Sequence, residues 1–166
     1  MLINLDRHIC RAKDVKTGEW VYGYYVCVPM EYGHGELVYA IFDPNKCEHI
    51  CMGEYKDYGW YEVDPDTVCS CTGLHDSNKT PIFEKDIIEF VGPSIHRDLI
   101  WWNNEMSEMV AIPLDGIEFN GFDYWNGNYP KYTYSTFCLM MQDPWGDFKE
   151  INVVGNIVDN PELLEE

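Results

Sequence analysis

The sequence predicts a mainly β protein with very little helix, and three observations support that fold class. Short apolar runs recur along the 166 residues, separated by Gly, Pro, Asn and Asp, as expected for strands joined by turns. Helical periodicity is rare. Phe, Trp and Tyr make up 15% of the chain, and aromatic residues favour strands. The length suits one domain or two very small ones that share a core.

The first half is expected to form short strands joined by tight turns. A turn at residues 14–18 joins strands at 9–13 and 19–28 into a hairpin. A strand at 37–42 is followed by an irregular excursion over 45–59, and strands at 60–63 and 68–72 flank a turn at 64–66. Trp20 and Tyr22 share one strand face, where we expect core or sheet contacts rather than ligand binding. Gly23 is expected to allow a bulge or the close approach of another strand.

The second half is expected to form a small barrel. A polar stretch over 72–82 predicts a boundary between an N-terminal β-rich region, 1–72, and a C-terminal region, 73–166, unless the two form one intertwined domain. Gly73 is expected to end a strand, and Asp76 to cap the next turn. Strand-like runs at 82–91, 99–102, 109–114, 117–119, 132–141 and 151–157 suffice for a barrel of roughly five strands. Asn160 and Pro161 predict a final helix of barely more than one turn.

The charge balance argues against nucleic acid as a direct partner. The chain has 29 Asp and Glu against 11 Lys and Arg, a formal charge of −18, which opposes direct binding to nucleic acid. No run approaches the roughly 18 apolar residues of a membrane-spanning helix, and residues 1–11 lack an apolar leader. We therefore expect an intracellular protein without membrane contact. The acids are interpreted as a solvated surface, and the alternative is an acidic face that binds a basic partner.

Cysteines and paired acids are the candidate chemical groups. Cys47 and Cys51 with His49, and Cys69 and Cys71 with His75, could in principle bind zinc, but their x3 and x1 spacings differ from the usual Cys-x-x-Cys knuckle. We expect ordinary reduced thiols, no metal and no cofactor, although whether the four cysteines meet in space is left open.

Glu84 and Asp86 could share a strand face as a catalytic pair, but acids at such places are usually hydrogen-bonded turn groups. The chain has no Gly-rich phosphate loop, His-Glu-x-x-His motif or nucleophile elbow.

The segment 122–131 is the most function-like part of the sequence. Aromatic residues alternate there with Gly and Asn, a composition common in binding surfaces. The candidate interaction residues are Tyr124, Trp125, Tyr129 and Tyr132. The alternative is that these rings pack back onto the protein as a small satellite core.

Several motifs follow one another along the chain: Arg-Ala-Lys-Asp at 11–14, Thr-Gly-Glu-Trp-Val-Tyr-Gly at 17–23, and the segments 60–68, 72–76, 82–88, 153–157 and 160–164. Together, in this order, they resemble the YopX family of phage and prophage proteins. The resemblance spans nearly the whole chain, with an unmatched insert at about 101–132. It differs at Lys13, where Trp is usual, at Ser70-Cys71, where Gln-Tyr is usual, and at Lys85, where Gly is usual.

The resemblance implies a β-rich fold whose second half is similar to an SH3-like barrel, encoded on a mobile element and acting in the cytoplasm of a bacterial host. It brings no catalytic residues and no established biochemical activity. We expect a non-catalytic interaction or assembly module that self-associates or contacts a host or phage protein with a basic surface. The alternatives are an acidic DNA-mimic decoy of a host DNA-binding protein and an enzyme with a cryptic metal or carboxylate site.

Overall fold

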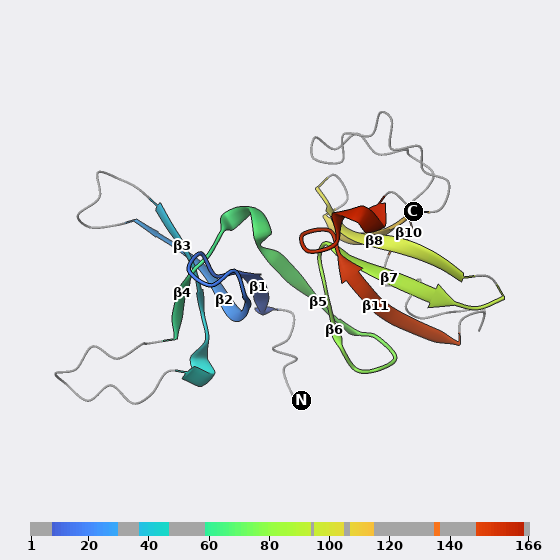
Figure 1. Cartoon of the computed structure of the whole chain (residues 1–166), viewed down its shortest axis with the longest axis horizontal. Coiled ribbons are helices and arrows are strands. Elements are labelled where there is room, and N and C mark those ends of the chain that lie inside the picture. Colours follow the sequence, from blue (N-terminus) through green and yellow to red (C-terminus); the bar gives the residue numbers. More distant parts are fainter. Residues whose placement is uncertain are drawn as a thin grey trace. The chain divides into compact units, whose positions relative to one another are not determined.

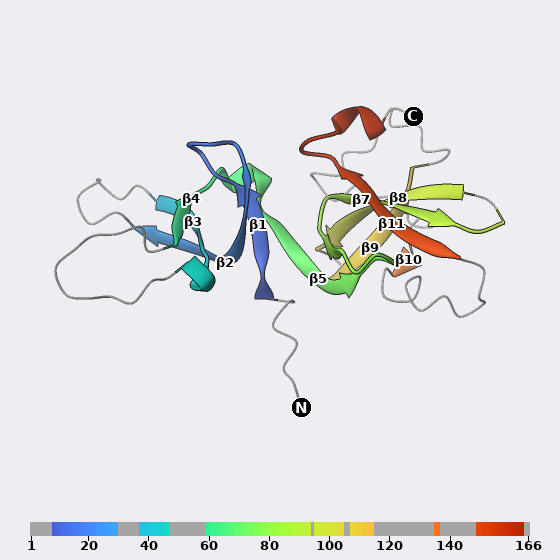
Figure 2. The ribbon, with the colours of Figure 1, turned by 60° about the horizontal axis from the view of Figure 1, so that its bottom comes forward.

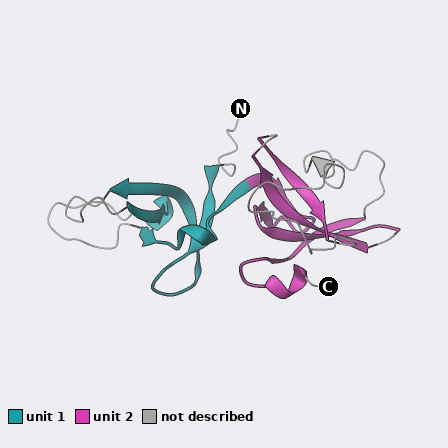
Figure 3. Cartoon of the chain, turned by 90° about the horizontal axis from the view of Figure 1, so that it is seen from above, with its two compact units in different colours: residues 1–71 teal, residues 72–166 magenta. Residues whose placement is uncertain are grey.

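The computed structural model describes residues 8–29, 37–46, 59–93, 95–104, 107–114, 135–136 and 149–164. The chain divides into two compact units, residues 1–71 and 72–166 (Figure 3). The strands form two antiparallel sheets (Figure 1). The strand order of the first is β4 (Trp60–Glu62), β3 (Leu37–Phe42), β2 (Trp20–Pro29), β1 (Cys10–Lys13), β5 (Cys69–His75) and β6 (Pro81–Phe83). The order of the second is β10 (Ser135–Thr136), β9 (Glu108–Pro113), β8 (Ile95–Asn103), β7 (Asp86–Val91) and β11 (Glu150–Asn156). Helix in the described part is confined to short 3₁₀ segments, Pro44–Lys46, Pro65–Thr67 and Pro161–Leu164 among them. The predicted mainly β fold is therefore confirmed.

Unit 1 is built on a long central strand. Strand β2 (Trp20–Pro29) pairs through its first residues with β1 (Cys10–Lys13) and through its remaining residues with β3 (Leu37–Phe42). β4 (Trp60–Glu62) pairs with β3. β1 and β2 form the predicted hairpin, in which the Asp14 carboxylate accepts the backbone N–H groups of Lys16 and Thr17.

The strands of unit 1 close into a ring. Beyond β4, the Val63 N–H donates to Tyr39 O (2.9 Å) on β3, and Val63 also forms an isolated bridge with Asp14, next to the end of β1. Two hydrogen bonds flank this bridge, from Val15 N to Glu62 O (2.9 Å) and from Asp64 N to Lys13 O (3.0 Å). Closure places Ala12, Ile41 and Val63 in a buried core. Such closure removes exposed strand edges.

Gly23 permits the tight packing of β3 on β2, as the sequence predicted. A Cβ atom at this position would lie 2.1 Å from the Phe42 carbonyl oxygen, far inside van der Waals contact. The glycine also lies where β2 changes partner, since Gly23 pairs with Cys10 of β1 and Tyr24 pairs with Phe42 of β3. The end of β3 and the turn that follows it therefore lie close against β2.

Unit 2 contains an antiparallel meander joined by the last strand. β7 (Asp86–Val91), β8 (Ile95–Asn103) and β9 (Glu108–Pro113) pair in sequence, β10 (Ser135–Thr136) pairs with β9, and β11 (Glu150–Asn156) returns to pair with β7 (Figure 2). Closure of this sheet into an SH3-like barrel stays a prediction.

Both faces of the unit 2 sheet are apolar, because its strands contain consecutive buried residues whose side chains point to alternate faces. One face carries Ile88, Phe90, Ile100 and Ala111, which form a buried cluster with Ile82 of β6 (Pro81–Phe83). The other carries Ile87, Leu99, Trp101, Val110 and Ile112, against which Leu163 and Leu164 of the final 3₁₀ helix pack. The predicted final turn thus covers a core face.

Three local predictions need correction. β5 (Cys69–His75) runs through Gly73, whose φ is +76°, so this glycine bends the strand but does not end it. The run 82–91 is two strands, β6 (Pro81–Phe83) and β7, joined by a turn in which Lys85 has φ +68°. Asn160 does not act as a standard N-cap, since its Oδ1 accepts the Asn156 N–H (3.4 Å).

The loop between β5 and β6 occupies the outer edge of β11. Asp76 is 8% exposed, and its carboxylate accepts the N–H groups of Asn78 (2.8 Å), Thr80 (2.8 Å) and Val153 (3.3 Å). Ser77 exchanges two further hydrogen bonds with Ile151. The predicted capping role of Asp76 is confirmed, and the same loop covers a strand edge that could otherwise pair with another chain.

Candidate functional site

A row of aromatic side chains crosses unit 1 on the outer face of its sheet. Tyr24 on β2 pairs with Phe42 on β3, and Phe42 pairs with Trp60 on β4, so the three side chains share one face. The Phe42 and Trp60 rings are 5.4 Å apart between centroids. Along β2 the row continues through alternate residues. We call this set the aromatic face: Trp20, Tyr22, Tyr24, Phe42 and Trp60.

The aromatic face is partly open to solvent. Tyr22 and Trp60 are each 48% exposed, whereas Trp20, Tyr24 and Phe42 are half-buried. The expected sharing of one face by Trp20 and Tyr22 agrees with the register, but Tyr22 is no core residue. Large rings held on a paired strand at this exposure are a typical binding surface.

Two cations pack on one end of the aromatic face. The Arg11 guanidinium and the Lys13 ammonium each lie 4.6 Å from the Trp20 ring centroid. Lys13 pairs with Trp20 across the β1–β2 hairpin, which places its ammonium against the ring. These contacts hold Trp20 in place, whereas the exposed rings of the aromatic face are those of Tyr22 and Trp60.

A groove of about 320 Å³ lies beside Tyr22 and Tyr24. Its opposite wall is the turn Asp43-Pro44-Asn45, with Ile9 and Gly23 completing the lining. The Asp43 carboxylate accepts the Asn45 N–H (2.9 Å) and so holds the turn in shape. The close packing at Gly23 brings this turn against β2.

The opposite face of β2 and β3 differs in character. Tyr25 stacks on Tyr39 with 6.3 Å between ring centroids, and burial raises the pKa of the Tyr25 hydroxyl above its ordinary value of 10.0, with smaller contributions from Cys27, Tyr39 and Cys10. Nearby, the Lys46 ammonium donates to the Tyr61 hydroxyl (2.9 Å), and this hydrogen bond raises the Lys46 pKa.

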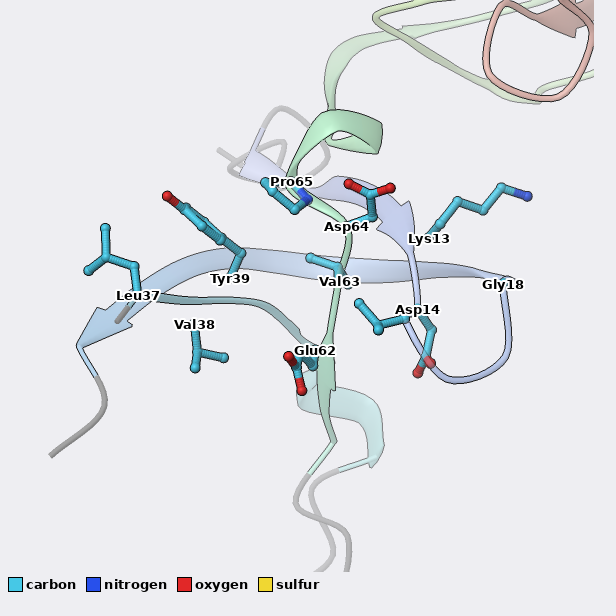
Figure 4. A pocket seen from close by; sticks show the side chains of 11 residues that line it. Lys13, Asp14, Gly18, Leu37, Val38, Tyr39, Glu62, Val63, Asp64 and Pro65 are labelled. Atoms are coloured by element: carbon cyan, nitrogen blue, oxygen red, sulfur yellow. The ribbon is translucent and has the colours of Figure 1, made fainter. Parts of the chain in front are cut away.

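A second concavity, of about 510 Å³, lies where the ring of unit 1 closes (Figure 4). Asp14, Glu62 and Asp64 contribute carboxylates, but Asp14 and Asp64 each accept backbone N–H groups in turns. The described lining contains no Ser, Cys or His. The cleft lies along the seam at which β1 and β4 close the ring of unit 1.

The residues that the sequence suggested as catalytic or metal-binding groups have structural roles where the structure describes them. Asp86 is fully buried and accepts the Phe83 N–H (2.8 Å) in the β6–β7 turn, as the non-catalytic interpretation expected. Cys69 and Cys71 are both buried on one face of β5, and the Cys69 thiol donates to Thr67 O (3.2 Å). Cys47, His49 and Cys51 lie outside the described residues, so convergence of the four cysteines stays untested.

The four predicted interaction residues, Tyr124, Trp125, Tyr129 and Tyr132, also lie outside the described residues. Sequence reasoning overlooked the aromatic face instead. The signal was present as aromatic residues at 20, 22 and 24, but their alignment with Phe42 and Trp60 depends on strand register.

No helix in the described part of the chain is long and apolar enough to cross a membrane. No group of three or more His, Cys, Asp or Glu side chains in that part of the chain is arranged to hold a metal ion.

Comparison with known proteins gives one match. A family model described as YopX protein matches residues 10–165. No curated protein matches the chain.

Proposed function

The chain belongs to the YopX protein family, and from this premise we propose that it is a non-catalytic protein-interaction module encoded by a phage or another mobile element. The aromatic face of unit 1 is the observation that carries the proposal. It offers exposed rings at Tyr22 and Trp60 on a sheet whose strands fix their positions. Rigid aromatic anchors supply most of the binding energy in many interfaces.

The chemistry of the described residues supports interaction over catalysis. The carboxylates of Asp14, Asp64, Asp76 and Asp86 accept backbone N–H groups in turns. The charge of the chain favours a partner with a basic surface. Because the whole chain carries a formal charge of −18, it would attract such a partner and repel nucleic acid. The module would act in the cytoplasm of the bacterial host.

Affinity capture with matched variants tests the proposal. The tagged chain is expressed in its bacterial host during induction of the element, and bound proteins are quantified for the wild type and for the Tyr22→Ala/Trp60→Ala double variant. We expect at least one protein captured by the wild type to fall about tenfold or more in the double variant. Tyr25→Ala and Trp102→Ala, which remove exposed rings elsewhere, should leave its capture unchanged.

The same experiment distinguishes an interaction module from the alternative, an acidic DNA-mimic decoy. A captured DNA-binding protein that is released by added duplex DNA would support the decoy. A set of captured proteins that is identical for the wild type and the double variant would contradict the aromatic face as the interaction surface.

A further inference from the structure

The groove beside Tyr22 and Tyr24 suggests the chemistry of the partner. Its lining is preformed: Tyr22 and Tyr24 occupy alternate positions of one strand, and Pro44 belongs to a turn that the Asp43 carboxylate holds in shape. Binding to a preformed surface avoids the loss of conformational entropy that ordering a loop would require. The shape of the groove then limits which backbone conformation can enter it.

Two common modes of peptide binding do not fit this place. Strand addition would find only a short edge here, because residues 24–29 of β2 are already paired with β3 on the side where residues 20–23 are not, and the Phe42 carbonyl lies close against Gly23. An α-helix has a diameter of about 10–12 Å including side chains and needs a long apolar trough. A groove of about 320 Å³ with polar Asp43 and Asn45 on one wall is too small and too polar for it.

The polyproline II conformation does fit. It has about three residues per turn, makes no internal hydrogen bonds, and docks into aromatic-lined grooves by packing proline rings between aromatic rings. Tyr22, Tyr24 and Pro44 supply such rings. Proline-rich backbone presents carbonyl acceptors, and the Asn45 side-chain amide and the tyrosine hydroxyls at this groove are donors of the matching type.

Charge adds a preference for a basic residue in the partner. Asp43 lines the groove, and its Oδ1 atom accepts the Asn45 N–H. Lys46, in the same turn, interacts electrostatically with Asp43, but its ammonium donates to the Tyr61 hydroxyl (2.9 Å). Arg11 pairs with Tyr22 but is 7% exposed and packs over Trp20. An Arg or Lys flanking the prolines would therefore meet a carboxylate at the groove and an attractive field from the whole chain.

We infer that the groove formed by Tyr22, Tyr24 and Asp43-Pro44-Asn45 binds a proline-rich segment in polyproline II conformation that carries a flanking basic residue. This inference deepens the proposed function, on which it rests, by naming the class of partner. Tyr22 and Tyr24 are the apolar anchors, and Asp43 selects the basic flank.

Fluorescence anisotropy with a synthetic peptide tests the inference on the full chain. The probe is a fluorescein-labelled Arg-Ala-Pro-Leu-Pro-Pro-Leu-Pro-Ala, and its control has every Pro replaced by Ala. We expect the wild type to bind the probe at least about tenfold more tightly than the control, because the alanine peptide must lose more backbone freedom and lacks the rings. Equal affinity for both peptides, or binding to neither, overturns the inference.

Matched variants locate the binding. Tyr22→Ala should weaken probe binding about tenfold, whereas Tyr25→Ala, on the opposite face of the same strand, should not weaken it. Asp43→Asn keeps the acceptor for Asn45 and removes the charge, so it should weaken the Arg-bearing probe about threefold and leave a probe with Ala in place of Arg unaffected. Circular dichroism confirms that each variant is folded. Equal loss for Tyr22→Ala and Tyr25→Ala contradicts the assignment.

The peptide and capture experiments fail in different ways. If the proline-rich probe does not bind but the Tyr22→Ala/Trp60→Ala variant still loses its captured partner, the partner class is wrong and the interaction function stands. If neither experiment responds to the aromatic substitutions, both proposals are overturned.

Discussion

At the scale of single residues, aspartates shape this acidic chain by accepting backbone N–H groups. Such turn carboxylates are Asp14, Asp43, Asp64, Asp76 and Asp86. An Asp side chain can mimic a backbone turn in this way. Part of the strong negative charge is thus explained by the many tight turns of a protein built from short strands.

Asp76 is expected to be the most important of these turn residues for stability. Asp76→Ala leaves three N–H groups without their acceptor, two in the loop and one on β11, and should lower the free energy of unfolding by about 2 kcal/mol or more. Asp43→Ala, which removes a single exposed cap, should lower it by about 0.5–1 kcal/mol. Urea unfolding measures both, and a smaller loss for Asp76→Ala than for Asp43→Ala would refute this ranking.

Lys79 offers a stabilising substitution. Its φ of +68° lies in the left-handed region, which is unfavourable for a residue with a Cβ and accessible to glycine. Lys79→Gly should raise the free energy of unfolding by about 0.5–1 kcal/mol. Lys79→Ala keeps the Cβ and should give no gain, so equal stabilisation by both variants in urea unfolding would argue against backbone strain as the cause.

Sequence reasoning succeeded for residues whose role is local. The capping role of Asp76 and the turn role of Asp86 can be predicted from the residues next to them in the sequence. Lys85 could not be understood in that way. Its φ of +68° is a conformation that favours glycine, and a lysine at this position gives no sign of it in the sequence.

At the scale of elements, the strands of the first half were predictable and those of the second half less so. Residues 9–13, 19–28 and 37–42 have turn signals on both sides and match β1, β2 and β3 closely. The turn between β6 and β7 was missed because its two residues, Glu84 and Lys85, are not Gly, Pro, Asn or Asp. β8 begins at Ile95, whereas the predicted strand began at residue 99. The prediction missed the start of the strand because His96, Arg97 and Asp98 are polar.

Gly23→Ala tests the element packing on which the groove depends. The added Cβ would overlap the Phe42 carbonyl, so β3 must move, and we expect a loss of about 3 kcal/mol or more in the free energy of unfolding. Gly18→Ala is the matched control: its φ is +71° but nothing lies within 4 Å of the added Cβ, so only strain of about 1 kcal/mol is expected. Similar losses for the two variants in urea unfolding would show that close strand packing is unimportant.

At the scale of the whole molecule, the closure of unit 1 and the aromatic face arise from contacts between distant parts of the sequence. The Asp14–Val63 bridge and the Tyr24–Phe42–Trp60 row depend on strand register. No local pattern contains that information, because a shift of one residue would reverse every side chain. The family, by contrast, was recognisable from ordered motifs alone, and the match over residues 10–165 confirms it.

Self-association is predicted through aromatic side chains. The outer edge of β11 is covered by the 76–80 loop, so rings are better candidates than that edge, and Trp125 and Tyr129 remain the proposed anchors. High net charge limits open-ended aggregation while permitting a closed symmetric contact. Sedimentation equilibrium over a concentration series should show a discrete oligomer that Trp125→Ala weakens. A single monomeric species at tens of micromolar, unchanged by the substitution, would exclude it.

Site-specific photo-crosslinking in the bacterial host most directly tests whether the aromatic face is the interaction surface. A photoreactive phenylalanine analogue is placed at Tyr22 or Trp60, and, for comparison, at Tyr25 of unit 1 or Val154 of unit 2, which are 37% and 40% exposed. We predict that Tyr22 and Trp60 give the same discrete adduct with another protein, and that Tyr25 and Val154 do not. Adducts only from Tyr25 or Val154, or no adduct from Tyr22 and Trp60, would contradict the central claim.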